Sequence, residues 1–566
     1  EVYANDYHRE LLRSSERLQA TIHQPLGAVP LPLGLSESGM VITEGAGPAD
    51  LGANEYNSMY LDEGFGLQAK VLGGTQGTGA YDVAVNGNRE TLAFSLGQYR
   101  YKSDGYRENN DVDYKISNAF VQWQPTQNLG FQAELGQRDD NIGDLTTEFG
   151  ANTFSDTARE ISDGETHRVS MKYQPGPGTY FVINVTDKNE SSTESKSFIL
   201  PDLTIEFTNE EISNSNQYEL ELAHEFSNTT LKGGVKSSKA ESAGTSSNHY
   251  VEFDFLELTE NSSEETLEQA FFYSNISTLD NTLLLIIGAE HNNATHSVQL
   301  GGEAPIISHD IDKILYPKLG AAWSITPQIK LRTAIYETIS IAPKISWNLS
   351  PTHIAGFAQV YDHFNAGTTS SNKAIGIDIS PSRRYEVGLD VQRQDLSIPA
   401  FSSSGIVESD MQYDLVNAYL DYTITEKMGA YIKLSTEDID RDQNLNTTFT
   451  LFPLTLKNQS LNIGFTYQLS NSSFMSIESK HIQQQYSTEP DPVLFVTGEN
   501  FGDRLNIINA SIEVNLPKRL GKVSLIGKNL LDSQFNFADF ELMYSTPSRQ
   551  KLTPERVLLI NLEINI

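Results

Sequence analysis

The chain has 566 residues, a net charge of −34 and no cysteine. This acidity argues against nucleic acid as a partner because phosphates would be repelled, and the lack of cysteine excludes disulfides and thiolate metal sites. The longest apolar run, Leu283–Ala289, is far shorter than the roughly 20 residues of a membrane helix, so a helical membrane bundle is also excluded.

Residues 1–65 differ in texture from the rest of the chain. Asn5–Ile22 is predicted to be helical because Tyr7, Leu11 and Leu18 lie close to one helix face. Residues 24–54 are rich in glycine and proline and have no clear period. We expect residues 1–65 to be a helix followed by a segment that is either irregular or packed inside a larger structure.

From residue 66 to residue 566 the pattern predicts β-strands joined by turns. Gly73–Gly79 is interpreted as the turn between the first two strands. Apolar and polar side chains then alternate, as expected of strands with two different faces. The clearest of these segments are residues 218–226, 385–392, 416–424, 428–435, 461–469, 508–516 and 558–566.

Three features favour a barrel in a membrane over a soluble β-protein. The strands are about 10–12 residues long, which matches a tilted membrane crossing. Tight turns such as Thr425-Glu426 are expected to alternate with long polar stretches such as 138–163 and 485–503. Aromatic side chains also gather near the expected strand ends, where a membrane interface favours them; they are Tyr99, Tyr101, Phe120, Trp123, Phe271, Phe272 and Tyr273.

The predicted fold is therefore all-β, a transmembrane antiparallel β-barrel of about 22–24 strands in the bacterial outer membrane. A barrel of this width cannot fill its interior with its own side chains, so it is either an open channel or holds a plug. The last strand is predicted to close the barrel, to face outer-membrane lipid and to be read by the barrel-assembly machinery. Its apolar face consists of Leu558, Ile560, Leu562, Ile564 and Ile566.

Alternation also predicts which carboxylates point into the lumen. The candidates are Glu219, Glu221, Glu225, Glu386, Asp390, Asp421 and Glu513. They either favour cations in the lumen or only keep it hydrated, and the overall acidity likewise fits either soluble long loops or an acidic passage. No GxSxG elbow is present, so we expect no catalytic residues and no enzyme.

One acidic run has the spacing of calcium ligands. Asp438, Asp440 and Asp442 alternate as in a calcium loop, but the positions that need glycine and glutamate hold Gln443 and Phe449. A solvated acidic turn is the better interpretation, and we expect no cofactor beyond Ca²⁺ on acidic loops.

Four segments resemble the barrels of TonB-dependent receptors, in the order found in that family. They are Tyr316–Trp323 (YPKLGAAW), Leu331–Pro343 (LRTAIYETISIAP), Lys522–Asp532 (KVSLIGKNLLD) and Thr546–Arg549 (TPSR). The chain departs from the family because too few residues precede the strands for a globular plug, and no energy-coupling box is evident near the N-terminus.

Three other segments resemble large outer-membrane proteins that join periplasmic tetratricopeptide repeats to a receptor-like barrel. They are Gly47–Tyr56, Ser103–Asp111 and Pro351–His363. This resemblance implies a helical module upstream, with Asn5–Ile22 as its last helix.

Three functions follow as alternatives. The first is a conduit that exports a polymer or protein with the help of a periplasmic module. The second is a TonB-coupled uptake receptor for a siderophore, cobalamin or glycan. The third is a surface anchor that binds an extracellular protein through the acidic stretches 189–213 and 364–381.

Overall fold

The computed structural model describes most of the chain between residue 63 and the C-terminus. The described ranges are 63–144, 155–200, 203–301, 306–339, 349–351, 353–358, 367–382, 384–402, 405–442, 454–487, 500–535 and 555–566. The predicted N-terminal helix and irregular segment lie outside them, as does Thr546–Arg549. Among these residues, no helix reaches the length and apolar character that a membrane span requires.

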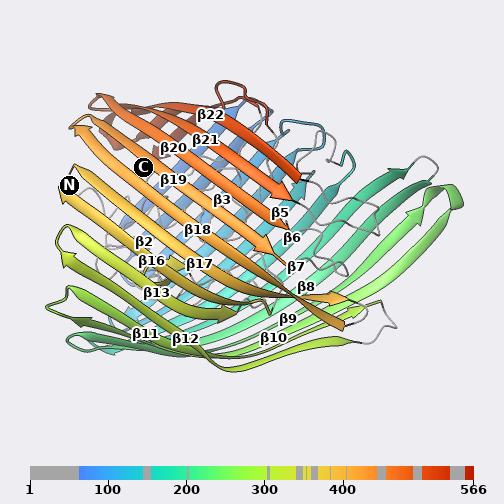
Figure 1. Ribbon diagram of the computed structural model, residues 1–566, viewed down its shortest axis with the longest axis horizontal. Coiled ribbons are helices and arrows are strands. Elements are labelled where there is room, and N and C mark those ends of the chain that lie inside the picture. The colour runs from blue at the N-terminus through green and yellow to red at the C-terminus, as the bar shows by residue number, and fades with distance from the viewer. Residues whose placement is uncertain are drawn as a thin grey trace.

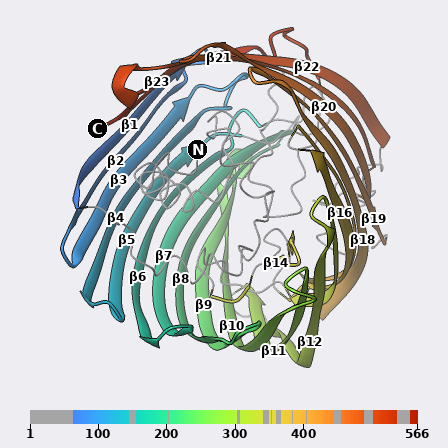
Figure 2. The ribbon, with the colours of Figure 1, turned by 90° about the vertical axis from the view of Figure 1, so that its left-hand side faces the viewer.

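The described strands form one closed antiparallel sheet of 22 strands and a separate two-stranded hairpin (Figures 1 and 2). The first half of the sheet contains β1 Gly64–Gly74, β2 Gly79–Arg89, β3 Leu92–Ser103, β4 Val112–Thr126, β5 Leu129–Ile142, β6 Arg159–Gly176, β7 Thr179–Leu200, β8 Leu203–Glu225, β9 Thr229–Tyr250, β10 Phe255–Thr278 and β11 Leu283–Leu300. The second half contains β12 Ile307–Thr326, β13 Ile329–Ile339, β16 Thr369–Ser382, β17 Tyr385–Ser402, β18 Gly405–Thr425, β19 Met428–Arg441, β20 Thr455–Ser470, β21 Ser473–Ser487, β22 Asn500–Asn515, β23 Gly521–Lys528 and β24 Val557–Asn565.

The barrel closes because β24 pairs with two strands. It lies antiparallel to β23 on one side and to β1 on the other, with Ile560 opposite both Leu525 and Gly73. The separate hairpin consists of β14 His353–Ile354 and β15 Phe357–Ala358, and short 3-10 turns occupy Val251–Phe253 and Pro517–Arg519. The predicted membrane-barrel fold is confirmed.

The two faces of the sheet differ as alternation requires. On β8, Leu220 and Leu222 are 42% and 44% exposed on the outer face, whereas Glu219 and Glu221 between them are buried on the inner face. The same contrast recurs around the wall, with Leu135, Val169 and similar side chains exposed outside. A soluble protein would bury such residues, so this outer band is the surface that contacts lipid.

Aromatic side chains form an outer girdle next to the short turns. Trp123 and Phe131 stack with ring centroids 5.6 Å apart beside the β4–β5 turn. The ring centroids of Tyr385 and Tyr422 lie 5.8 Å apart at the end of the barrel where β17 begins and β18 ends. The expected belt was partly wrong: only Trp123 and Phe272 of the seven predicted aromatics point outward. The other five are buried because alternation places them on the inner face; they are Tyr99, Tyr101, Phe120, Phe271 and Tyr273.

The two ends of the barrel differ in the length of their connections. At one end the turns are short, as at residues 90–91, 127–128 and 426–427, whereas the opposite end carries long connections such as residues 340–368. Outer-membrane barrels place short turns in the periplasm and long loops outside, which orients this barrel.

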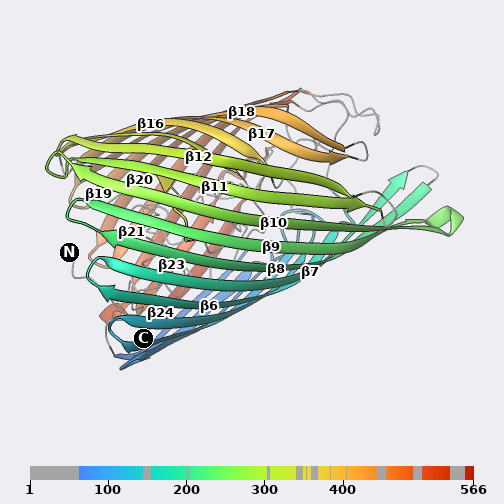
Figure 3. The same ribbon diagram turned by 90° about the horizontal axis from the view of Figure 1, so that it is seen from below.

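Two predicted acidic loops are strands instead. Residues 189–213 lie mostly in β7 and β8, and residues 369–382 form β16. For residues 189–213 the prediction failed because β7 to β10 project far beyond the rest of the wall (Figures 1 and 3). A projecting strand has water on both faces, so it lacks the apolar alternation of a membrane-facing strand.

Candidate functional site: the lumen and its folded-in hairpin

A short hairpin from the long β13–β16 connection lies inside the barrel (Figure 2). Its turn residues Ala355 and Gly356 have φ values of +49° and +91°. Positive φ at both central positions defines the tight two-residue turn that matches the twist of a β-hairpin. The local sequence Ile354-Ala355-Gly356-Phe357 therefore suits this turn, and it belongs to the segment Pro351–His363 noted above.

Two apolar side chains attach the hairpin to the inner wall. Ile354 and Phe357 are 0% and 4% exposed. They pack in one cluster with side chains of β10, β13 and β16, namely Phe271, Tyr273, Ala334, Tyr336 and Ala374. Burying an isoleucine or phenylalanine side chain contributes about 1.5–3 kcal/mol, so this contact is strong enough to hold a short hairpin in place.

Leu349 attaches the preceding segment to a different part of the wall. Its backbone N–H donates a hydrogen bond of 3.1 Å to Oε1 of Glu219 on β8. Its side chain is 3% exposed and packs on Val182 of β7. Asn184 Nδ2 donates to the other oxygen of Glu219 at 3.0 Å, so both carboxylate oxygens are used.

An arginine beside the hairpin joins two carboxylates. Arg332 on β13 donates from Nε to Asp378 at 2.9 Å and from Nη2 to Asp390 at 2.7 Å. The guanidinium carbon also lies 5.1 Å from the centre of the Phe357 ring, a cation–π distance. Tyr419 donates to Asp378 at 3.0 Å, so this group links β13, β16, β17, β18 and the hairpin.

Further cations on the inner wall were missed at the sequence level. Lys318 Nζ lies 3.1 Å from Glu290, which also accepts from Tyr273, and Arg168 is paired with Glu134. Lys318 and Arg168 are almost fully buried. Their inward position could have been predicted from the sequence, because each cation occupies the polar face of an alternating strand. Lys318 also lies in the YPKLGAAW segment.

The predicted lumen carboxylates lie at several places on the wall. Glu219 and Glu221 are buried near one another on β8, where Tyr180 donates to Glu221 at 2.8 Å. Asp390 belongs to the Arg332 group, and Glu386 accepts from Tyr419 at 3.4 Å. Glu513 on β22 lies 3.0 Å from Lys522, Asp421 is on β18, and Glu225 is exposed at the end of β8. They therefore do not form one site, and most have a partner.

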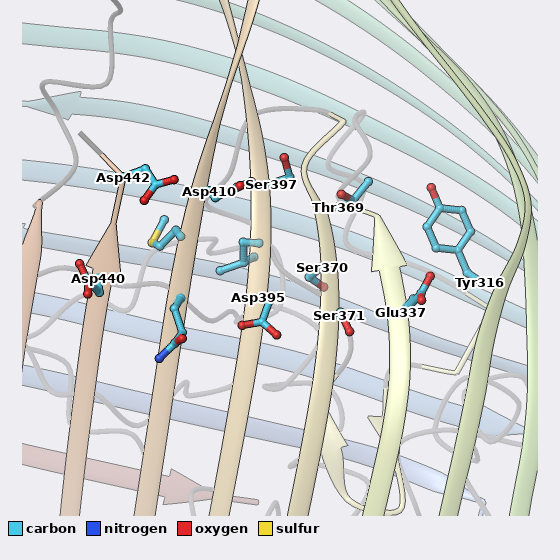
Figure 4. A pocket seen from close by; sticks show the side chains of 13 residues that line it. Tyr316, Glu337, Thr369, Ser370, Ser371, Asp395, Ser397, Asp410, Asp440 and Asp442 are labelled. Carbon is cyan, nitrogen blue, oxygen red and sulfur yellow. The ribbon is translucent and has the colours of Figure 1, made fainter. Parts of the chain in front are cut away.

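A cavity of about 600 Å³ is bordered by residues of β12, β13 and β16 to β19 (Figure 4). Its lining residues Asp395, Asp410 and Asp440 alternate with buried neighbours and share the outward side of their strands. It lies where β12 leaves β13: their pairing ends at Lys318 and Tyr336, whereas β12 remains paired with β11 as far as Ile307. Tyr316 lines the cavity at this seam.

The candidate calcium ligands line the same region. Asp440 and Asp442 border the cavity, and Asp438 lies 3.3 Å from Lys457 on β20. In the part of the chain that the structure describes, no three acidic or histidine side chains are grouped for a metal.

The apolar face of the C-terminal strand points outward, as the alternation of its residues predicts. Leu558, Ile560 and Ile566 are 43%, 60% and 63% exposed on the outer face, and Leu562 and Ile564 lie on the same side. Leu559 and Asn561 are buried on the inner face.

The comparisons point to one kind of barrel. The ferric citrate transporter FecA superposes with a TM-score of 0.67 at 10% identity, over 89% of this chain and 79% of that one. The copper transporter OprC gives 0.68 at 10% over 89% and 80%, and the siderophore receptor PiuA from Acinetobacter baumannii gives 0.65 at 9% over 89% and 82%. The chain has the fold of a TonB-dependent receptor barrel. It is an integral outer-membrane protein.

Comparison of the sequence with protein families gives one match, to part of the barrel. A family model described as a lipocalin-like domain matches residues 148–255. In the structure this stretch runs through β6, β7, β8 and β9, which are consecutive strands of the large barrel. No curated protein matches the sequence.

Proposed function

We propose that this receptor-like barrel takes up a small solute from outside the cell. The observation that carries the proposal is the hairpin Ile354–Phe357, which is packed on the inner wall of a barrel with the receptor fold. A docked element inside the lumen favours a selective passage over a wide one. It therefore supports the uptake alternative over the export of a polymer or a folded protein.

The inner wall also bears on the class of solute. Fixed charges of both signs, such as Arg332 with Asp390 and Lys318 with Glu290, make this wall polar. The similar structures are named for ferric citrate, copper and a siderophore. We therefore propose a metal ion or a small metal chelate as the solute, with energy supplied through TonB, and we assign no catalytic role.

Two measurements on the full chain test this function. In a planar bilayer, the uptake proposal expects little steady conductance without ligand, whereas an export conduit would conduct strongly. Ferric citrate, a ferric hydroxamate and Cu²⁺ are then titrated against the protein while its tryptophan fluorescence is recorded. Saturable binding of one of them supports the proposal, and a large open conductance with no binding of any of them would overturn it.

Energy coupling needs a cellular measurement. Uptake of the radiolabelled ligand is compared between host cells with and without TonB, and the proposal expects uptake to stop in cells without it. Unchanged uptake in those cells would show passive entry and remove the TonB-coupled part of the proposal.

A further inference from the structure

Four neighbouring strands form a tongue that projects from the outer rim. Strands β7 to β10, residues Thr179–Thr278, contain 22, 23, 22 and 24 residues, whereas β1 and β2 contain 11 each. Beyond the rim the tongue loses both flanking strands, because pairing with β6 stops at Ser195 and pairing with β11 stops at Asn261. The tongue is visible at the right of Figures 1 and 3.

The two edges of the tongue are treated differently. On the β7 edge, the hydroxyl of Thr157 accepts the N–H of Ser197 at 2.9 Å and donates to its carbonyl at 3.3 Å, which occupies the backbone there. On the β10 edge, the backbone turns away from β10 at Gly301, whose φ is +97°. Phe255–Glu260 then pairs with β9 alone among the described strands.

The backbone of this edge has a defined direction. Ser277 donates its N–H towards the β9 side, to the carbonyl of Asn228. The β9–β10 register has no irregularity, so every second residue along β10 repeats that direction. Leu256, Leu258 and Glu260 consequently direct their N–H and C=O groups away from β9, towards the open edge.

The edge is apolar as well as open. Phe255, Leu256 and Leu258 are 56%, 53% and 62% exposed, and Phe253 at the tip is 72% exposed. Natural proteins usually protect an edge strand with lysine, proline, a bulge or a covering loop. Among the described residues nothing protects this edge in that way, and an extended apolar edge of about 20 Å is a template on which another strand can pair.

The negative charge around this edge favours a basic segment as the strand that pairs with it. Residues 251–260 contain Glu252, Asp254, Glu257 and Glu260 and no lysine or arginine. Two of these carboxylates are held in place, since Glu252 accepts the N–H of Thr204 at 2.7 Å and Glu257 accepts the Tyr250 hydroxyl at 3.2 Å. A second copy of this edge would bring like charges together, so a basic segment is favoured over self-association.

We propose that Phe255–Glu260 is a docking edge for an extended, basic segment of another protein at the cell surface. The segment adds as a strand beside β10, with its backbone bonded to Leu256, Leu258 and Glu260. Its apolar side chains cover Leu256 and Leu258, and its lysines or arginines face the carboxylates. This site lies outside the lumen and does not depend on the proposed uptake function.

The first test measures binding of a defined probe to the full chain in nanodiscs. The probe is a fluorescent peptide of alternating lysine and valine, and its counterpart alternates glutamate and valine. We expect Leu258→Pro to weaken the lysine peptide at least about tenfold, because proline removes an N–H that faces the open edge and leaves the β9 pairing intact. Leu258→Thr keeps that N–H and should retain most of the binding. Equal binding to Leu258→Pro, or equal binding of the glutamate peptide, would overturn the proposal.

The second test locates the peptide without relying on affinity. The chain has no cysteine, so a single introduced thiol reports only its own position. With a mild thiol oxidant added to accept the two electrons, Leu256→Cys should form a disulfide with a cysteine-bearing lysine peptide. Ile212→Cys, 61% exposed on β8 between two paired strands, should not. Equal cross-linking at both positions would overturn the proposal, as would a disulfide-linked dimer of Leu256→Cys that excludes the peptide.

Discussion

Gly320 on β12 and Ile354 on the lumen hairpin are in such close contact that no side chain fits between them. A Cβ added to Gly320 would lie 2.7 Å from Cγ2 of Ile354 and 3.2 Å from Cβ of Ala355. The wall and the hairpin are therefore complementary in shape at this point, and the contact offers a way to displace the hairpin without altering it.

We predict that Gly320→Val detaches the hairpin and raises the single-channel conductance. The added methyl groups overlap Ile354, and the cost of overpacking, about 1–3 kcal/mol, is comparable to the burial that holds the hairpin. Gly136→Val is the matched control, since this inward glycine of β5 has Thr166 Cβ at 3.8 Å as its nearest neighbour. An equal rise in both variants, or none in Gly320→Val, would contradict a docked hairpin.

Arg332→Met should destabilise the barrel more than the same change at an exposed arginine. Removal of Arg332 leaves Asp378 and Asp390 without their cation on a poorly hydrated wall, and we expect a loss of about 1–3 kcal/mol after allowance for their partial exposure. The control is Arg393→Met, because the pair of Arg393 with Asp414 is on the outer face with the arginine 52% exposed. Urea unfolding in lipid measures both losses. Addition of Asp390→Asn should recover part of the first loss, and no recovery would argue against the pair as its cause.

The lumen carboxylates without a cation at bonding distance should carry any cation preference. Glu386→Gln together with Asp421→Asn should reduce the preference of the pore for cations over anions. This preference is measured as the reversal potential in a KCl gradient, with Gly320→Val present in every variant so that the pore conducts. Glu513→Gln should change it less, because Lys522 lies 3.0 Å from that carboxylate. Anion selectivity of the pore before these changes would contradict the assignment.

The tip of the tongue should lose order as pH rises. The hydrogen bond that the His249 ring donates to the Glu206 carboxylate, and then the one it donates to Asp254, raise the pKa of His249 above its ordinary value. Because the folded pKa is raised, the stabilisation is complete below the unfolded pKa and is lost as pH rises through the folded one. Hydrogen exchange, corrected for its intrinsic pH dependence, should show protection at residues 249–257 falling from mildly acidic to mildly alkaline pH. Residues 236–240 provide the internal reference, and His249→Gln should abolish the difference.

Local chemistry alone was sufficient to predict the kind of wall. The alternation in residues 218–226 and in the C-terminal strand reflects an environment that changes from lipid to interior at every residue. This pattern was enough to predict a membrane barrel, its approximate number of strands and the inward position of Glu219. The tight turn within Gly73–Gly79 was predictable for a different reason, because glycine adopts a positive φ at no steric cost, as Gly77 does at +60°.

The tertiary structure decided what the interior and the rim contain. Alternation places Arg332 and Asp390 on the same face but cannot pair them, because the partner depends on the register between strands 58 residues apart in sequence. The docking of Ile354 against Gly320 likewise depends on how a long connection returns to the wall, which no local pattern records. The tongue was not predicted, because strands with water on both faces show no alternation of apolar and polar residues. Its length is evident only in the structure, where β7 and β10 extend beyond their pairing with β6 and β11.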